Sequence, residues 1–131
     1  MTDTIQIQTS VDIEYEIQKI LASYMTVYCR PLPANFSMPC ILVTKVGGSD
    51  RDTIDNAEIV LDARAERESQ AVTLLNKAVG VLRKVSREST TPVRHIQVTS
   101  SGSWGVDPVR PDIAMCSARL SVTAHLENTT I

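Results

Sequence analysis

The chain has 131 residues, of which 43% are hydrophobic and 21% are charged, and its formal net charge at pH 7 is −2. This length predicts one domain with its own hydrophobic core, spanning residues 1–131. The near-neutral charge gives no general attraction to nucleic acid or to an anionic membrane. Aromatic residues make up only 4% of the chain, so we expect an aliphatic core.

The three cysteines, Cys29, Cys40 and Cys116, are widely spaced and odd in number, which argues against a disulfide framework or a paired zinc motif. Each lies in an apolar, strand-like segment, where a small buried thiol is expected. The first ten residues lack the basic start and apolar centre of a signal peptide. No stretch approaches the ~18 consecutive apolar residues of a membrane span. We therefore expect synthesis in a reducing cytosol.

The first nine residues are polar and predict a loose N-terminal arm. Apolar residues then recur at helical spacing, at Ile13, Ile17, Ile20, Leu21 and Tyr24. This pattern predicts a helix over residues 11–24, capped by Thr9 or Ser10. A short strand is predicted over 26–30, where Pro31 and Pro33 end it.

Residues 39–65 predict a β-hairpin. Its first strand is the short apolar run Ile41–Val43, which follows Pro39. Its second strand alternates between apolar and polar side chains over 54–65, which is longer than the average strand of about 5–6 residues. Between them, segment 47–53 holds two glycines and several charged residues, and it predicts an exposed turn.

The second half of the chain predicts one helix and two strands. The helix spans 66–88, where a helical stripe is formed by Ala71, Val72, Leu75, Ala78, Val79, Leu82 and Val85. A strand follows over 93–100, and a long loop over 101–112 contains two glycines and two prolines. Residues 114–126 alternate regularly, which predicts a strand with one covered face and one wet face. Residues 127–131 are predicted to be a tail.

The predicted order of elements is therefore α-β-β-β-α-β-β. Two amphipathic helices and a half-wet sheet predict a two-layer α+β domain. We expect a mostly antiparallel sheet of about five strands, with both helices packed on one face. The other face of the sheet is left polar.

No sequence motif indicates catalysis, so we expect no enzymatic activity, no cofactor and no bound metal. Three aspartates at positions 50, 52 and 55 lack the spacing of a calcium loop, and acids beside a glycine turn are usually solvated. His95 and His125 lie on the polar sides of their strands, but two histidines without a third ligand make a weak metal site.

Two segments are candidate interfaces with other proteins. The first is the predicted turn, with Gly47, Gly48, Asp50, Arg51 and Asp52. The second is the predicted loop, with Trp104, Asp107, Arg110 and Asp112. Trp and Arg are enriched among interface hot spots, and two prolines stiffen this loop before it binds. For Trp104, a cap on the core is an equally good interpretation, since tryptophan is usually well buried.

These features also occur together in a recognisable order. A short helix precedes an apolar strand that begins after Pro39, and the segment Val46-Gly47-Gly48-Ser49 leads into an acid-rich turn. A long strand ending in Val60–Ala65, an Ala-rich helix, the Pro-Asp loop 107–112 and a long alternating strand follow. Over residues 11–126, the chain resembles the tail terminator (tail-completion, head-to-tail joining) proteins of long-tailed bacteriophages.

This resemblance implies a structural virion protein, made in the host cytoplasm and placed at the head-proximal end of the tail. Such proteins form a ring, usually of six subunits, which ends growth of the tail tube and docks head-completion proteins. The expected partners are therefore further copies of this chain, the tail-tube protein and a head-side connector. The polar sheet face would line a channel that DNA crosses without specific binding. We expect Glu58, Asp62, Arg94, Arg119 and His125 to face that channel.

Two other functions stay open at this stage. The first is a neighbouring virion part, either another connector or a tail-tube protein, and a tube protein differs by polymerising with itself. The second is a small α+β enzyme, which would need a concave pocket with convergent polar groups.

Overall fold

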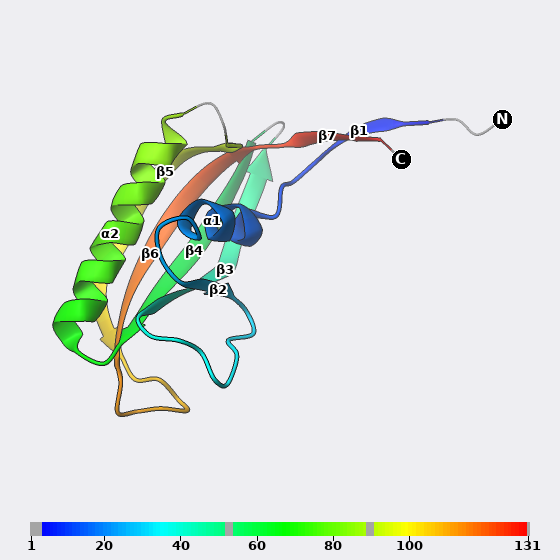
Figure 1. Cartoon of the computed structure of the whole chain (residues 1–131). Coiled ribbons are helices and arrows are strands. Elements are labelled where there is room, and N and C mark those ends of the chain that lie inside the picture. Colours follow the sequence, from blue (N-terminus) through cyan, green and yellow to red (C-terminus); the bar gives the residue numbers. More distant parts are fainter. Residues whose placement is uncertain (1–3, 52–53, 89–90, 131) are drawn as a thin grey trace.

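The computed structural model describes residues 4–51, 54–88 and 91–130. It contains, in chain order, β1 (Gln6–Thr9), α1 (Ile13–Leu21), β2 (Val27–Cys29), β3 (Cys40–Arg51), β4 (Ile54–Ala65), α2 (Glu68–Ser86), β5 (Val93–Gly105), β6 (Ala114–His125) and β7 (Glu127–Thr130). Figure 1 shows a twisted sheet with both helices on one side of it, and a two-stranded ribbon that extends away from the sheet. The predicted α+β class is confirmed.

The main sheet has five strands in the order β2-β3-β4-β6-β5. Only β2 and β3 are parallel, and the other neighbours are antiparallel. Helix α2 lies across β4, β6 and β5, while α1 contacts α2, β2 and β3. This arrangement covers one face of the sheet and leaves the central part of the other face without a helix (Figure 1).

The core follows from the period-2 pattern of the two central strands. Because Ile59 pairs with Leu120 and Leu61 pairs with Ala118, their side chains share the face beneath the helices. All four residues are at most 2% exposed. Leu75 of α2 joins them in one cluster. Burying one such large aliphatic side chain contributes about 1.5–3 kcal/mol.

Helix α1 is shorter than predicted, and its cap is a different residue. Asp12, not Thr9 or Ser10, is the N-cap, and its side chain accepts a hydrogen bond from the Tyr15 N–H at 3.2 Å. Thr9 belongs to β1, and is therefore paired in a strand. Helix α2 begins and ends two residues inside its predicted limits. Among the described helices, neither α1 nor α2 combines the length and the apolar character that crossing a membrane requires.

The predicted turn at Gly47 and Gly48 is wrong, because both glycines lie within β3. The pairing of β3 with β4 shifts between Lys45 and Gly47, which marks a β-bulge. Gly48 has a φ of 143°, and a Cβ there would lie 2.9 Å from the Cα of Ala57 and even closer to the backbone oxygen of Asn56. Glycine is thus needed for close strand approach. The connection to β4 at 52–53 lies outside the described residues.

The predicted loop over 101–112 is also wrong in its first part. Strand β5 continues to Gly105, and Ser103, Trp104 and Gly105 pair with Ser117, Cys116 and Met115 of β6. Its pairing is irregular at three places, and two of them, between Val98 and Ser100 and between Ser100 and Ser103, lie in or beside the Ser- and Gly-rich segment. The loop that remains spans residues 106–113.

The two termini form a ribbon in place of the predicted loose arm and tail. Residues 6–9 of β1 pair antiparallel with residues 127–130 of β7. The hydroxyl oxygens of Thr9 and Thr129 lie 2.8 Å apart and share a hydrogen bond. The ribbon leaves the main sheet as a continuation of β6 (Figure 1).

Candidate functional site: the open face of the sheet

The sheet face opposite the helices carries a row of polar residues, which we call the open face. Even-numbered residues of β4 lie beside odd-numbered residues of β6, so Asn56 pairs with Thr123 and Asp62 pairs with Ser117. These side chains point away from the helices because successive strand residues alternate between faces. The period-2 pattern of the sequence thus places the row correctly.

Neighbouring side chains of the open face bind one another. Thr123 Oγ1 donates to Asn56 Oδ1 at 2.9 Å, and Ser117 Oγ donates to Asp62 Oδ1. Arg119 Nη1 lies 2.9 Å from Glu58 Oε1, with 49% and 44% of the two side chains exposed. An exposed ion pair of this kind adds less than about 1 kcal/mol to stability. Its main effect is to neutralise charge on the face.

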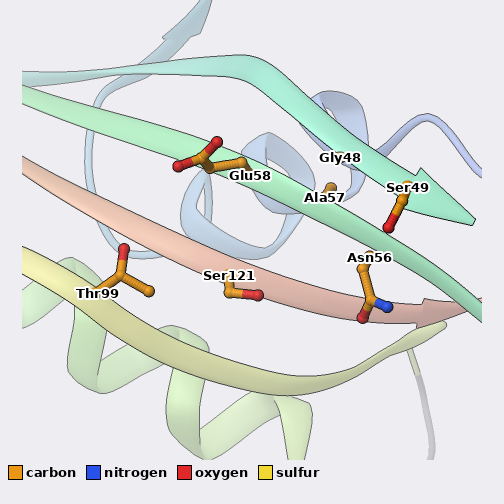
Figure 2. A pocket seen from close by; sticks show the side chains of 7 residues that line it. All are labelled: Gly48, Ser49, Asn56, Ala57, Glu58, Thr99 and Ser121. Carbon is orange, nitrogen blue, oxygen red and sulfur yellow. The ribbon is translucent and has the colours of Figure 1, made fainter.

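A shallow hollow of about 330 Å³ lies on the open face. Figure 2 shows its lining side chains on strands β3, β4, β6 and β5, with the helices behind the sheet. The lining consists of Gly48, Ser49, Asn56, Ala57, Glu58, Thr99 and Ser121. In the described part of the chain, Glu58 is its only charged member. The hollow therefore offers hydroxyl and amide groups around one acid that already binds Arg119.

The predicted channel residues are largely on this face. Asp62 and Arg119 belong to the open row, and His125 lies at its far end, opposite Ile54. Arg94 differs, because it falls in the irregularity between Val93 and His95 of β5. The pairing with Thr123 brings His95, not Arg94, into the open row. Alternation in the sequence could not predict which of the two residues faces outward, because the irregularity shifts the pairing of β5 with β6 by one residue.

The predicted turn residues are spread along the end of the hairpin. Gly48 lines the hollow, and Gly47 lies beside Glu58. Asp50 and Arg51 end β3, and Asp52 lies outside the described residues. Asp55 is not solvated as expected: it is 4% exposed and pairs with buried Ala124.

The predicted loop residues fall into two groups. Trp104 is 50% exposed, so it does not cap the core. Arg110 is half-buried; its guanidinium carbon lies 5.8 Å from the centre of the Phe36 ring, and its Nη2 lies 3.8 Å from Asp112 Oδ2. Asp107 is only 2% exposed, which contradicts its expected place on an outer surface.

Asp107 is buried because it binds an arginine that sequence reasoning missed. Arg64 Nε donates to Asp107 Oδ2 at 2.6 Å, and the N–H groups of Val109 and Arg110 donate to Oδ1 at 2.9 and 2.8 Å. Burial alone raises the pKa of Asp107, but the hydrogen bonds from Arg64, Arg110 and Val109 outweigh it and hold that pKa below its ordinary value. The two side chains are 43 residues apart, so no local pattern signals their pairing.

The cysteines and acids of the described chain offer little chemistry. Burial raises the pKa of the Cys40 thiol to about 11, and it also raises the pKa of Cys29 and of Cys116. Such thiols stay protonated at neutral pH, and a protonated thiol is a poor nucleophile. Over residues 4–51, 54–88 and 91–130, no three His, Cys, Asp or Glu side chains group together as metal ligands.

Both edges of the sheet are accessible to another chain. Strand β5 is the outermost strand on one side. On the other side, β2 covers only Ile41–Val43 of β3, and the Glu14 side chain accepts from the Lys45 N–H at 2.6 Å. Beyond Lys45, the side of β3 that faces away from β4 has no strand beside it in the described part of the chain, and Val46 is 46% exposed. Unpaired edges of this kind are places where a further strand can add.

Comparison with known protein families and with curated proteins finds no match to this chain. Function therefore has to be inferred from the open face, from the sheet edges and from the sequence resemblance. Chemically, the open face offers hydroxyl, amide and paired charged groups, and the edges offer backbone N–H and C=O groups that a further strand could pair with.

Proposed function

We propose that this protein is a tail terminator of a long-tailed bacteriophage, a structural and non-enzymatic protein that forms a ring of six copies. The observation that carries the proposal is the open face, where an ion pair and hydrogen bonds engage Arg119 and two of the acids. Arg119 binds Glu58, and Asp62 accepts a hydrogen bond from Ser117. Turned toward the axis of a ring, such a face neutralises few phosphates. DNA then passes through without tight binding, since affinity for DNA grows with the number of phosphates neutralised.

The two sheet edges support ring formation. A closed ring with one subunit type needs two different surfaces that fit each other, because each subunit contacts its neighbours head to tail. The β5 edge and the β3 edge beyond Lys45 lie on opposite sides of the sheet. The exposed Trp104, on β5, adds an apolar side chain at one of these surfaces.

In this proposal the ring sits at the head-proximal end of the tail. One rim contacts the last ring of the tail-tube protein and ends its growth, and the other rim contacts a head-side connector. The alternatives are another connector or a tube protein, which would share the ring but not the function of ending tube growth.

The purified chain is expected to form closed rings. Its native mass, measured by light scattering, should be close to six times the 14.4 kDa of one subunit, and negative-stain images should show single rings with a central hole. Open-ended tubes would instead identify a tube protein. A monomer at all concentrations, in the absence and presence of tail tubes, would contradict the proposal.

Replacing Trp104 with Ala should weaken ring formation without unfolding the subunit. Surface substitutions usually change the free energy of unfolding by less than about 0.5 kcal/mol. Loss of an aromatic interface anchor commonly costs about 2 kcal/mol or more of binding free energy, which is about thirtyfold or more in affinity. Urea unfolding and ring mass together separate the two effects.

Tyr24→Ala is the matched control for this substitution. Tyr24 is also an exposed aromatic residue, at 54%, but it follows α1 and is not on β5. The Tyr24→Ala protein should form rings as the unchanged protein does. Equal ring formation by Trp104→Ala and Tyr24→Ala would exclude Trp104 from the subunit interface.

A further inference from the structure

The ribbon of β1 and β7 is a small sheet that stands apart from the rest of the domain. Each strand has four residues, and over the described residues each has only the other strand beside it. Figure 1 shows the ribbon extending away from the main sheet, on the side of the molecule opposite α2 and β5. A two-stranded sheet of this size is only marginally stable in water. The ribbon therefore needs a further surface to hold its structure.

One face of the ribbon exposes aliphatic side chains. Ile5 immediately precedes β1 and is 56% exposed, and Ile7 lies within β1 and is 36% exposed. Because they are two residues apart on an extended chain, both side chains point to the same face. The side of β1 that faces away from β7 also has free backbone N–H and C=O groups. Apolar side chains beside an unpaired backbone are the features by which a strand adds to the edge of another sheet.

The β5 edge has matching features. Strand β5 is outermost, and its outer side has no strand beside it in the part of the chain that the structure describes. Its last residues, Ser103–Gly105, pair with β6 without irregularity. Trp104 pairs there with the buried Cys116, so its side chain is on the helix-covered side of the sheet, yet it is 50% exposed. The β5 edge thus offers a large apolar side chain beside unpaired backbone groups.

We propose that the ribbon of one copy of this chain binds the β5 edge of a second copy. The outer side of β1 adds as a further strand, and Ile5 and Ile7 pack against Trp104. A second copy is the partner because the same chain carries both halves of the contact. The two halves lie on opposite sides of the molecule (Figure 1), so the contact is head to tail, as a closed ring requires. This inference rests on the proposed ring and names the segment that joins its neighbouring copies.

Ile7→Asp should weaken the association of copies, because it places a charge where Ile7 meets Trp104. Light scattering over a dilution series measures the dissociation constant, which should rise by about tenfold or more. Tyr15→Asp is the control, since Tyr15 is 54% exposed but belongs to α1. The Tyr15→Asp protein should associate as the unchanged protein does. Equal association of the two variants would overturn the ribbon contact.

The mass of the unchanged protein separates the ribbon contact from the six-copy ring. Rings formed equally well by the unchanged protein and by Ile7→Asp would support the ring and overturn the ribbon contact. A smaller assembly that Ile7→Asp dissociates would do the opposite. A protein that is monomeric at every concentration, with and without tail tubes, would overturn both.

A double-mutant cycle tests whether the ribbon reaches Trp104 itself. Aspartate within β1 can also disturb the ribbon, so the cycle uses the milder Ile7→Ala together with Trp104→Ala. If the two side chains contact each other, the combined loss of affinity should be clearly smaller than the product of the two single losses. Urea unfolding checks that each subunit remains folded. A combined loss equal to that product would show that the ribbon does not contact Trp104, and would overturn the inference.

Discussion

Replacing Leu120 with Ala should lower the free energy of unfolding by about 2–5 kcal/mol. Leu120 is fully buried at the centre of the sheet, between Ile59 of β4 and Val98 of β5. It belongs to the same core cluster as Leu75 and Leu82 of α2. Removing its side chain leaves a cavity. The strands on both sides hold the surrounding backbone in place, so the cavity cannot close fully. Urea unfolding followed by circular dichroism gives the free energy directly.

Arg119→Ala is the control, because Arg119 is the preceding residue on the same strand but points to the open face. It loses only the exposed ion pair with Glu58, so the change should stay below about 1 kcal/mol. Both variants shorten one side chain of β6. If Arg119→Ala were the more destabilising of the two, the assigned pairing of β6 would be shifted by one residue.

The central strands β4 and β6 and the helix α2 could be predicted from the sequence, because the hydrophobic patterns that define them are local. Alternation over 54–65 and 114–126 defines which face of each strand is buried, and the stripe from Ala71 to Leu82 does the same for α2. These patterns need no knowledge of the partner. The same alternation is sufficient to assign Asp62 and Arg119 to the open face, where their strand pairing places them.

The errors in the strands share a physical cause, which is hydrogen bonding to a neighbouring strand. Gly47 and Gly48 are typical of turns, yet hydrogen bonding to β4 keeps them in a strand that continues to Arg51. The Ser- and Gly-rich end of β5 is held in the same way by β6. The ribbon of β1 and β7 joins the two ends of the chain. In each case tertiary pairing overrides local propensity.

The buried pair of Arg64 and Asp107 was also beyond sequence reasoning. Arg64 follows the alternation as an outward polar residue, and Asp107 stands in a Pro-containing loop that looks exposed. Two features of the fold bury them together. The loop 106–113 turns back over the end of the sheet, and Asp107 holds that turn by accepting hydrogen bonds from the two backbone N–H groups that follow Pro108.

Replacing Asp107 with Ala should therefore destabilise the protein at pH 7 by about 3–5 kcal/mol, because it leaves the Arg64 guanidinium buried without its counter-charge. Asp112→Ala is the control: Asp112 is also a loop aspartate near an arginine, but its side chain is 73% exposed and its pair with Arg110 spans 3.8 Å. It should change stability by less than about 1 kcal/mol. Urea midpoints of both variants measure the difference.

The effect should also depend on pH in a defined direction. The folded protein holds the pKa of Asp107 below its ordinary value of 3.8. A carboxyl group with a lowered folded pKa contributes stability above the unfolded pKa and loses it as the pH falls through the folded pKa. The stability gap between the unchanged protein and Asp107→Ala should thus be constant near neutral pH and narrow below 3.8. A gap that widens on acidification would contradict the ion pair.

The double substitution Arg64→Met with Asp107→Leu should recover much of the loss, since replacing both charges leaves no unpaired ion.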